Sequence, residues 1–276
     1  MGRPAQAGRP VLRYNGAVGD TLELLQQADA ALALPRLGGM ARPNGVVIVS
    51  ERFWAFACVD GSLREGRMPK PPEVLQRLPL ARGLTRLWAS LAPVLRPGGV
   101  APRRERWLIL AAVFAPVGLA FVGGRWSTFS AIGLSLLLLF TILRGRALQL
   151  HGAEHRAITA TEERRLAATW RGAAKPSRFS PRCGTNFAAL ALPVTFLADR
   201  LLPLATEFWT PLVVMVLSLA LTMELWRVVQ RSSRRIWQAF LLPGLALQRL
   251  TTREPRLDET QVALVAVAAV LRRELG

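Results

Sequence analysis

The chain is poor in the residues that most often carry redox and metal chemistry, with two cysteines and two histidines among 276 residues. Cys58 and Cys183 lie in different segments, so they predict no disulfide framework and indicate free thiols in a reducing compartment. The first 37 residues have scattered arginines and no long apolar run, which argues against a secretory signal peptide. Lysine is almost absent as well, with Lys70 and Lys175 beside many arginines. An arginine bias of this kind is typical of GC-rich genomes, so the high charge does not indicate nucleic-acid binding.

What the chain does have is apolar residues and positive charge together. Hydrophobic residues make up 51% of the sequence, the mean hydropathy is +0.27, and the formal net charge is +18. A soluble domain rarely combines these properties, whereas a membrane protein with basic cytoplasmic faces does so easily. The composition therefore predicts a bacterial inner-membrane protein, with the lipid bilayer as its main partner.

Four stretches are apolar enough to enter a bilayer, and we predict each as a transmembrane helix. At ~1.5 Å per residue, about 18 helical residues span roughly 27 Å, which is just adequate for a ~30 Å hydrocarbon core. A tight turn at 123–126 pairs the first two stretches as a hairpin, and the third carries Asp199 and Arg200 near its end. The four stretches are 107–124, 127–143, 187–204 and 208–226.

Basic residues predict the orientation of these helices. Of 36 arginines and lysines, all but Arg125 and Arg200 lie in the N-terminal region, the central loop or the C-terminal tail. By the positive-inside rule this distribution places both termini and the central loop in the cytoplasm. The predicted protein is therefore multi-pass, and any chemistry in the loop faces the cytoplasm. The basic run 231–235 is typical of contact with anionic lipid head groups.

The predicted fold is a membrane α-helical protein of four transmembrane helices with a small cytoplasmic α+β region near the N-terminus. The runs 45–50 and 53–59 are rich in β-branched and aromatic residues and predict a small sheet, while 75–95 has apolar residues at helical spacing. The segments are a flexible arm (1–37), the α+β region (38–106), the first hairpin (107–143), a cytoplasmic loop (144–186), the second hairpin (187–226) and a helical tail (227–276).

Both histidines fall in one five-residue motif, His151-Gly-Ala-Glu-His155. On a helix, positions i and i+4 share one face about one turn apart, which suits two ligands of one transition metal. The order H-x-x-E-H is also that of the inverzincin peptidases, in which the glutamate is a general base. No peptidase domain surrounds the motif, which follows a predicted membrane helix directly, so a peptidase is not the leading interpretation.

Two further motifs, 181–185 (PRCGT) and 243–255 (PGLALQRLTTREP), complete a recognisable set. Together with residues 151–156 they resemble the signature blocks of the YqhQ-like family, bacterial membrane proteins of unknown function described as metal-dependent enzymes. Blocks at 38–63 and 79–83 resemble the N-terminal blocks of that family, so the resemblance covers roughly 38–275. It implies a membrane-embedded fold and a metal-dependent enzyme.

The chain departs from the family pattern at two places. Where the family has G-G-Q-A-V-x-E-G, this chain has Met40 for the glutamine and Asn44 for the glutamate. Where the family has a histidine before P-R-C-G-T, this chain has Ser180. A third histidine and a carboxylate of the family pattern are therefore absent, so the comparison with the family implies weaker metal binding or lost activity in this divergent member.

Three ligands and one base define the expected site. His151, His155 and Cys183 are the candidate ligands of zinc or another divalent metal, and Glu154 is either a fourth ligand or the base that activates water. In the alternative interpretation Glu154 pairs with Arg156 or Arg182, and Cys183 is simply buried. The resemblance adds a surrounding polar site with Arg182, Thr185, Gln248, Thr251, Thr252, Arg253 and Glu254, and we include Glu224 as a carboxylate within a predicted membrane helix.

Two functions remain open at this point. The first is a membrane-bound metal-dependent enzyme, such as a hydrolase, with its site facing the cytoplasm. The second is a non-catalytic membrane scaffold whose basic face docks a cytoplasmic protein, a ribonucleoprotein or a second copy of the chain. Glu224 is a candidate because a carboxylate within a membrane helix is costly, although Arg227 at i+3 offers it an ordinary partner.

Overall fold

The computed structural model describes residues 18–122, 145–201, 210–232 and 234–276. Its only sheet in these ranges is an antiparallel meander in the order β1-β2-β3-β4. The central strands β2 (Gly45–Val49) and β3 (Phe53–Cys58) are the two apolar runs expected from the sequence. The edge strands β1 (Gly38–Arg42) and β4 (Leu63–Arg67) were missed, because one is rich in glycine and the other in charge.

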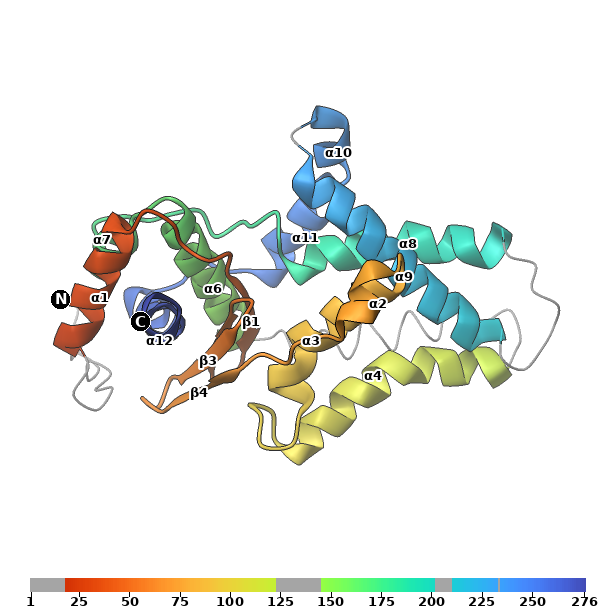
Figure 1. Ribbon diagram of the computed structural model, residues 1–276, viewed down its shortest axis with the longest axis horizontal. Helices are drawn as coiled ribbons and strands as arrows, with labels where there is room; N and C mark the ends of the chain where they lie inside the picture. The colour runs from red at the N-terminus through yellow and green to blue at the C-terminus, as the bar shows by residue number, and fades with distance from the viewer. Residues whose placement is uncertain (1–17, 123–144, 202–209, 233) are drawn as a thin grey trace, which may run out of the picture.

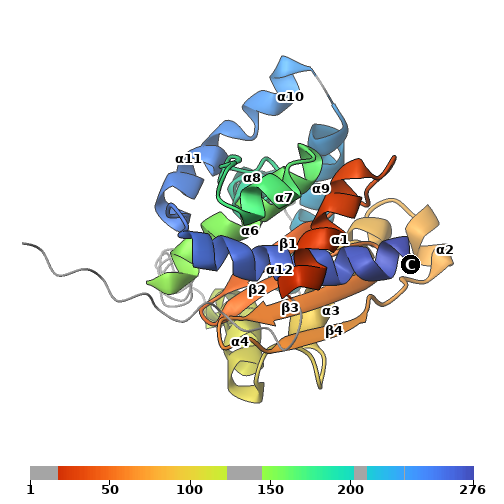
Figure 2. The ribbon, with the colours of Figure 1, turned by 90° about the vertical axis from the view of Figure 1, so that its left-hand side faces the viewer.

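Two helices from distant parts of the sequence cover one face of this sheet. α6 (Arg146–Glu162) packs on β1 and β2, and α12 (Leu257–Leu275) packs on β2 and β3. Figure 2 shows α12 running across the sheet, with α1 (Val18–Ala30) lying over it. The short helix α7 (Leu166–Trp170) closes the layer against α1 and α12. This layer holds the main hydrophobic core of the described chain.

The last helix has a different role from the one expected. We predicted residues 262–275 as part of a cytoplasmic tail, but every residue from 262 to 271 is buried. Alanine and valine dominate this stretch, and such small side chains let a helix pack closely on all sides. α12 is therefore the central helix of the core.

The remaining helices form an elongated part beside the sheet (Figure 1). α9 packs against α8, and it also contacts α3 and α4, so the third and fourth predicted spans are neighbours. These helices are α2 (Glu73–Arg77), α3 (Ala81–Leu95), α4 (Arg103–Val122), α8 (Gly184–Leu201), α9 (Thr210–Arg231), α10 (Arg235–Ala239) and α11 (Leu242–Thr251).

The prediction of four transmembrane helices is wrong. Among the described residues, α9 is the one helix long and apolar enough to cross a membrane, with a mean hydropathy of 2.0. The apolar part of α8, Gly184–Ala198, is too short to qualify, and α4 is not among the candidates in the described part of the chain. The second predicted span, 127–143, lies outside the described residues. Counting apolar residues overestimated the spans, because a packed helix and a membrane helix have similar composition.

Candidate metal centre

The two histidines lie on the face of α6 that meets the chain just before α8. Their rings are 4.5 Å apart between centroids, and both side chains are buried. Cys183 immediately precedes α8, and its Sγ lies 3.2 Å from Nε2 of His151. One ligand atom from each of these three residues lies within 4.8 Å of the other two. The structure thus brings together the three side chains that we predicted as metal ligands.

The other nitrogen of each ring is held by a backbone carbonyl. Nδ1 of His151 is 2.8 Å from the oxygen of Thr251, and Nδ1 of His155 is 2.7 Å from the oxygen of Arg178. A carbonyl oxygen only accepts, so each Nδ1 carries the proton and donates it. Each Nε2 is then left with its lone pair, in the orientation typical of metal-binding histidines.

Nε2 of His155 is the atom that best indicates that these residues fit a metal. This atom is buried and has no hydrogen-bond partner among the described residues. A buried polar atom without a partner costs free energy, and a metal ion in the cluster would satisfy it. Two imidazole nitrogens and a thiolate are a donor set that zinc prefers, and three protein ligands leave a fourth position for water or substrate.

Burial keeps both rings neutral, which is the form that binds metal. It lowers the pKa of His151, although the hydrogen bond to Thr251 works in the other direction. For His155, burial and then the neighbouring His151 lower the pKa to about 3. Neither ring therefore needs to lose a proton at neutral pH before it coordinates a metal.

Cys183 is held for coordination by its neighbour Thr185. The backbone N–H and the hydroxyl of Thr185 both donate to Sγ, at 3.4 Å and 3.2 Å. Burial, followed by the nearby charge of Glu154, raises the pKa of the thiol to about 11. Without a metal the thiol is thus protonated, and the positive charge of a bound metal would favour the thiolate.

Glu154 of α6 is buried against the first strand of the sheet. Its carboxyl contacts Gly39, where an added Cβ would lie 2.8 Å from Cγ of Glu154. Burial raises the pKa of Glu154 to about 8, and a hydrogen bond with the backbone of Ala41 opposes this. The glutamate is not one of the residues in the ligand cluster found among the described residues, so the geometry favours a base over a fourth ligand.

The alternative partners of Glu154 are engaged elsewhere. Arg156 donates to Glu254 at 2.6 Å, and Arg182 pairs with Glu162. Arg156 also donates to the backbone oxygen of Pro176. This arginine therefore ties both the 172–181 loop and the 251–255 turn to α6, a role that the sequence did not reveal.

The 251–255 turn is docked directly on the helix that carries the histidines. The N–H of Arg253 donates to the oxygen of Leu148 at 2.9 Å, and Arg178 donates to the oxygen of Thr252. The approach is so close that a Cβ on Gly152 would lie 2.2 Å from the oxygen of Arg253. The glycine of the His-Gly-Ala-Glu-His motif is therefore needed so that the carbonyl of Thr251 can reach His151.

Gln248 supports the loop before Cys183 and binds no metal ligand directly. Its side chain accepts from the N–H of Ser180 at 2.9 Å and donates to the Ser180 oxygen at 2.7 Å. Asn186 donates to the same oxygen, at 2.9 Å. Both amides are fully buried, and together they fix the turn that positions Cys183. Asn186 was absent from the sequence prediction, because a single asparagine has no distinguishing pattern.

Glu224 does not join this site in the described part of the chain. It pairs with Arg82 of α3, whose Nε lies 2.7 Å from Oε1, and it accepts from the N–H of Leu80. The partner is thus Arg82, and Arg227 contributes only through its charge. Glu224 links α9 to α3, which makes it a structural residue here.

The fold and site together define a largely helical protein with a four-stranded sheet and a buried His-His-Cys cluster that could bind a metal. The pattern of the family "Protein of unknown function (DUF1385)" matches residues 130–273, and the chain belongs to that family. Uncharacterized protein YqhQ of Bacillus subtilis (strain 168) is 32% identical over 148 residues.

The match with the Bacillus protein covers 52% of this chain and 46% of that protein, so the chain spans about half the length of the curated relative it matches. No solved structure matches the chain. The family match contains His151, His155 and Cys183 as well as the 251–255 turn. The predicted YqhQ-like family is therefore confirmed, while the N-terminal blocks lie outside the matched range.

Proposed function

We propose that this protein is a metal-dependent enzyme, of a hydrolytic kind, built on His151, His155 and Cys183. The observation that carries the proposal is the convergence of three buried donor atoms within 4.8 Å of one another, with each imidazole oriented through Nδ1. A cluster of this kind is costly unless something binds it, because burial disfavours every charged form of its members.

Each residue has a separate role in this proposal. A bound zinc ion, or another divalent metal, would supply a Lewis acid and lower the pKa of water at its fourth position. His151, His155 and Cys183 hold the metal, while the carbonyls of Thr251 and Arg178 keep the rings in place. Glu154 lies beside the cluster, and its ionised form, which becomes more populated as pH rises towards its pKa of about 8, serves as the group that takes up a proton.

Metal removal tests the proposal directly. Purified protein incubated with zinc and desalted is expected to retain about one ion per chain, because the three ligands define one site. It should hydrolyse p-nitrophenyl acetate, lose that activity on chelation, and regain it with zinc. A His151→Ala/His155→Ala variant should neither retain zinc nor recover. Wild-type protein that retains no more metal than this variant would reject the enzyme and leave a non-catalytic scaffold.

We further propose that the protein associates with the inner membrane, with its metal centre facing the cytoplasm. Support comes from the apolar helix α9 and from large apolar side chains exposed on α8, namely Leu192, Phe196 and Leu197. Arg231 and Arg235 flank the end of α9, where anionic head groups would lie. Purified protein is expected to float with vesicles that contain phosphatidylglycerol, and recovery in the protein-only fraction would contradict this.

A further inference from the structure

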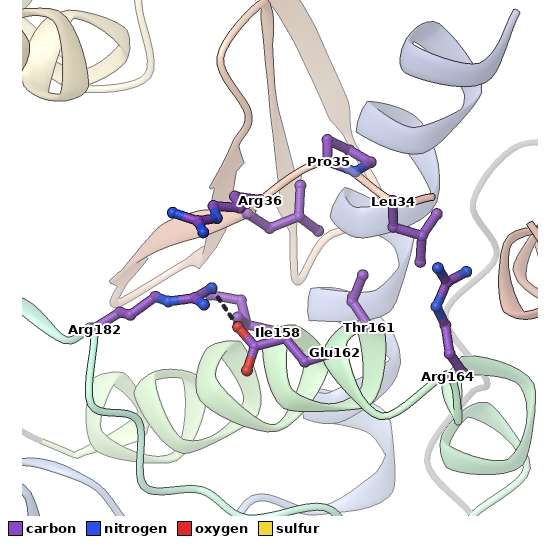
Figure 3. Close-up of a pocket in the computed structure, with 9 residues that line it drawn as sticks. Leu34, Pro35, Arg36, Ile158, Thr161, Glu162, Arg164 and Arg182 are labelled. Atoms are coloured by element: carbon purple, nitrogen blue, oxygen red, sulfur yellow. Dashed lines mark hydrogen bonds and ion pairs between the residues drawn. The ribbon is translucent and has the colours of Figure 1, made fainter. Parts of the chain in front are cut away.

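A small cavity lies near the C-terminal end of α6, one to two helical turns beyond His155. Its volume is about 170 Å³, which suits a small group rather than a drug-sized ligand. Three separate parts of the chain meet there: the segment between α1 and β1, the end of α6, and the turn before α8 (Figure 3). The lining includes Arg36, Ile158, Thr161, Glu162, Arg164 and Arg182.

The cavity is positively charged, because three arginines and one glutamate line it. Arg164 is already used by the fold. Its guanidinium donates to the backbone oxygens of Ala28 and Ala31, at 3.0 Å and 2.5 Å, near the end of α1. These bonds accompany a strained backbone, since Arg164 has a φ of 56°. Arg164 is therefore a structural part of the wall.

The other two arginines are available to a ligand. Arg182 pairs with Glu162, but this pair is exposed, with side-chain exposures of 41% and 44%, so solvent weakens it. Arg36 has no hydrogen bond or ion pair with any residue that the structure describes. Two guanidinium groups from different segments thus border one cavity, in which Glu162 supplies the single carboxylate and pairs with Arg182 (Figure 3).

We infer that this cavity binds the phosphate group of a small soluble compound. Guanidinium groups bind phosphate through paired, charge-assisted hydrogen bonds. Phosphate carries more negative charge and more acceptor oxygens than a carboxylate, so it is the better ligand to bind Arg36 and Arg182 at once. The hydroxyl of Thr161 already donates its proton to the backbone oxygen of Ala157, so Thr161 offers no hydrogen-bond donor to a phosphate.

The cavity and the metal cluster are neighbours but share no residue. Ile158 follows His155 by three residues on α6, and Arg182 is adjacent to Cys183 in the chain. A phosphate in the cavity would therefore lie near the metal centre. The inference itself does not require a metal, because none of the lining residues is a proposed ligand.

Titration of metal-free protein with inorganic phosphate, at constant ionic strength, tests the inference by calorimetry. We expect saturable binding that weakens about tenfold or more in Arg36→Gln and in Arg182→Gln, since each removes a charged donor. Glu162→Gln should bind more tightly than wild type, because it removes the carboxylate that competes for Arg182. A purely structural role for these residues would not produce changes in opposite directions.

Arg171→Gln is the matched control, because Arg171 is an exposed arginine at the end of α7 that does not line the cavity. Its affinity for phosphate should stay within about twofold of wild type. Equal weakening in all three arginine variants, or no saturable binding in wild type, would overturn the inference. Displacement of phosphate by phosphatidic acid vesicles would overturn the assignment to a soluble compound. Because the protein is metal-free throughout, failure here leaves the metal proposal untouched.

Discussion

Replacing Cys183 by serine is expected to weaken zinc binding at least about 100-fold. Loss of a partner outside the ligand shell already costs about 10–100-fold in metal affinity, and here a ligand itself is lost. A serine hydroxyl stays protonated at neutral pH and is a poor substitute for a thiolate. Competition with a chromophoric chelator measures the change.

Cys58→Ser provides a closely matched control. Cys58 is also buried and outside any disulfide, but it lies in β3, on the sheet face opposite α6 and α12. Both variants place a hydroxyl where a thiol was, so both should lose some stability. Only Cys183→Ser should lose zinc. Equal zinc affinity in Cys183→Ser and Cys58→Ser would remove the thiol from the proposed site.

The same reasoning predicts how zinc affinity depends on pH. Burial lowers the pKa of His155 to about 3 and raises the pKa of Cys183 to about 11. Near neutral pH neither Nε2 carries a proton that zinc would have to displace, whereas the thiol of Cys183 carries one. Zinc uptake should therefore release about one proton, and zinc affinity should rise about tenfold per pH unit between pH 6 and 8.

Glu154→Gln is expected to keep zinc while losing about 10²–10⁴-fold in the hydrolysis of p-nitrophenyl acetate. Glutamine has nearly the same shape as a protonated glutamate and can still bond to Ala41, so the contact with β1 should survive. It cannot take up a proton from water. Metal content and turnover, measured on the same preparation, separate the two roles.

Glu224→Gln is the control, because Glu224 pairs with Arg82 away from the cluster. It should retain both zinc and turnover.

A second readout for Glu154 comes from protein stability in the absence of metal. Burial raises the pKa of Glu154 from 4.5 to about 8, so the folded state binds this proton more tightly than the unfolded state. Stability should then fall as pH rises through this range.

In Glu154→Gln this fall in stability with pH should disappear, which urea unfolding at several pH values would show. Full turnover in Glu154→Gln would exclude the glutamate as the base. Loss of zinc in the same variant would instead indicate that Glu154 belongs to the ligand set.

The sequence alone identified the three residues of the buried cluster and the helix that carries two of them. Two histidines at i and i+4 on a helix must share a face, and the chain has no other histidine that could form such a site. The runs 45–50 and 53–59 likewise specified the two central strands, because the preference of β-branched and aromatic residues for strands is a local property. The motifs around Cys183 and 251–255 placed the chain in its family.

Only the tertiary structure decided what surrounds these residues. Glu154 lies on Gly39 and near Ala41, more than one hundred residues earlier in the chain, and no local pattern encodes such a contact. The same holds for the carbonyls that orient His151 and His155. Helix α12 shows the limit most clearly: its composition fits a short apolar tail, but packing against the sheet makes it the core. Apolar composition requires that a helix be shielded from water, and the fold decides whether protein or lipid shields it.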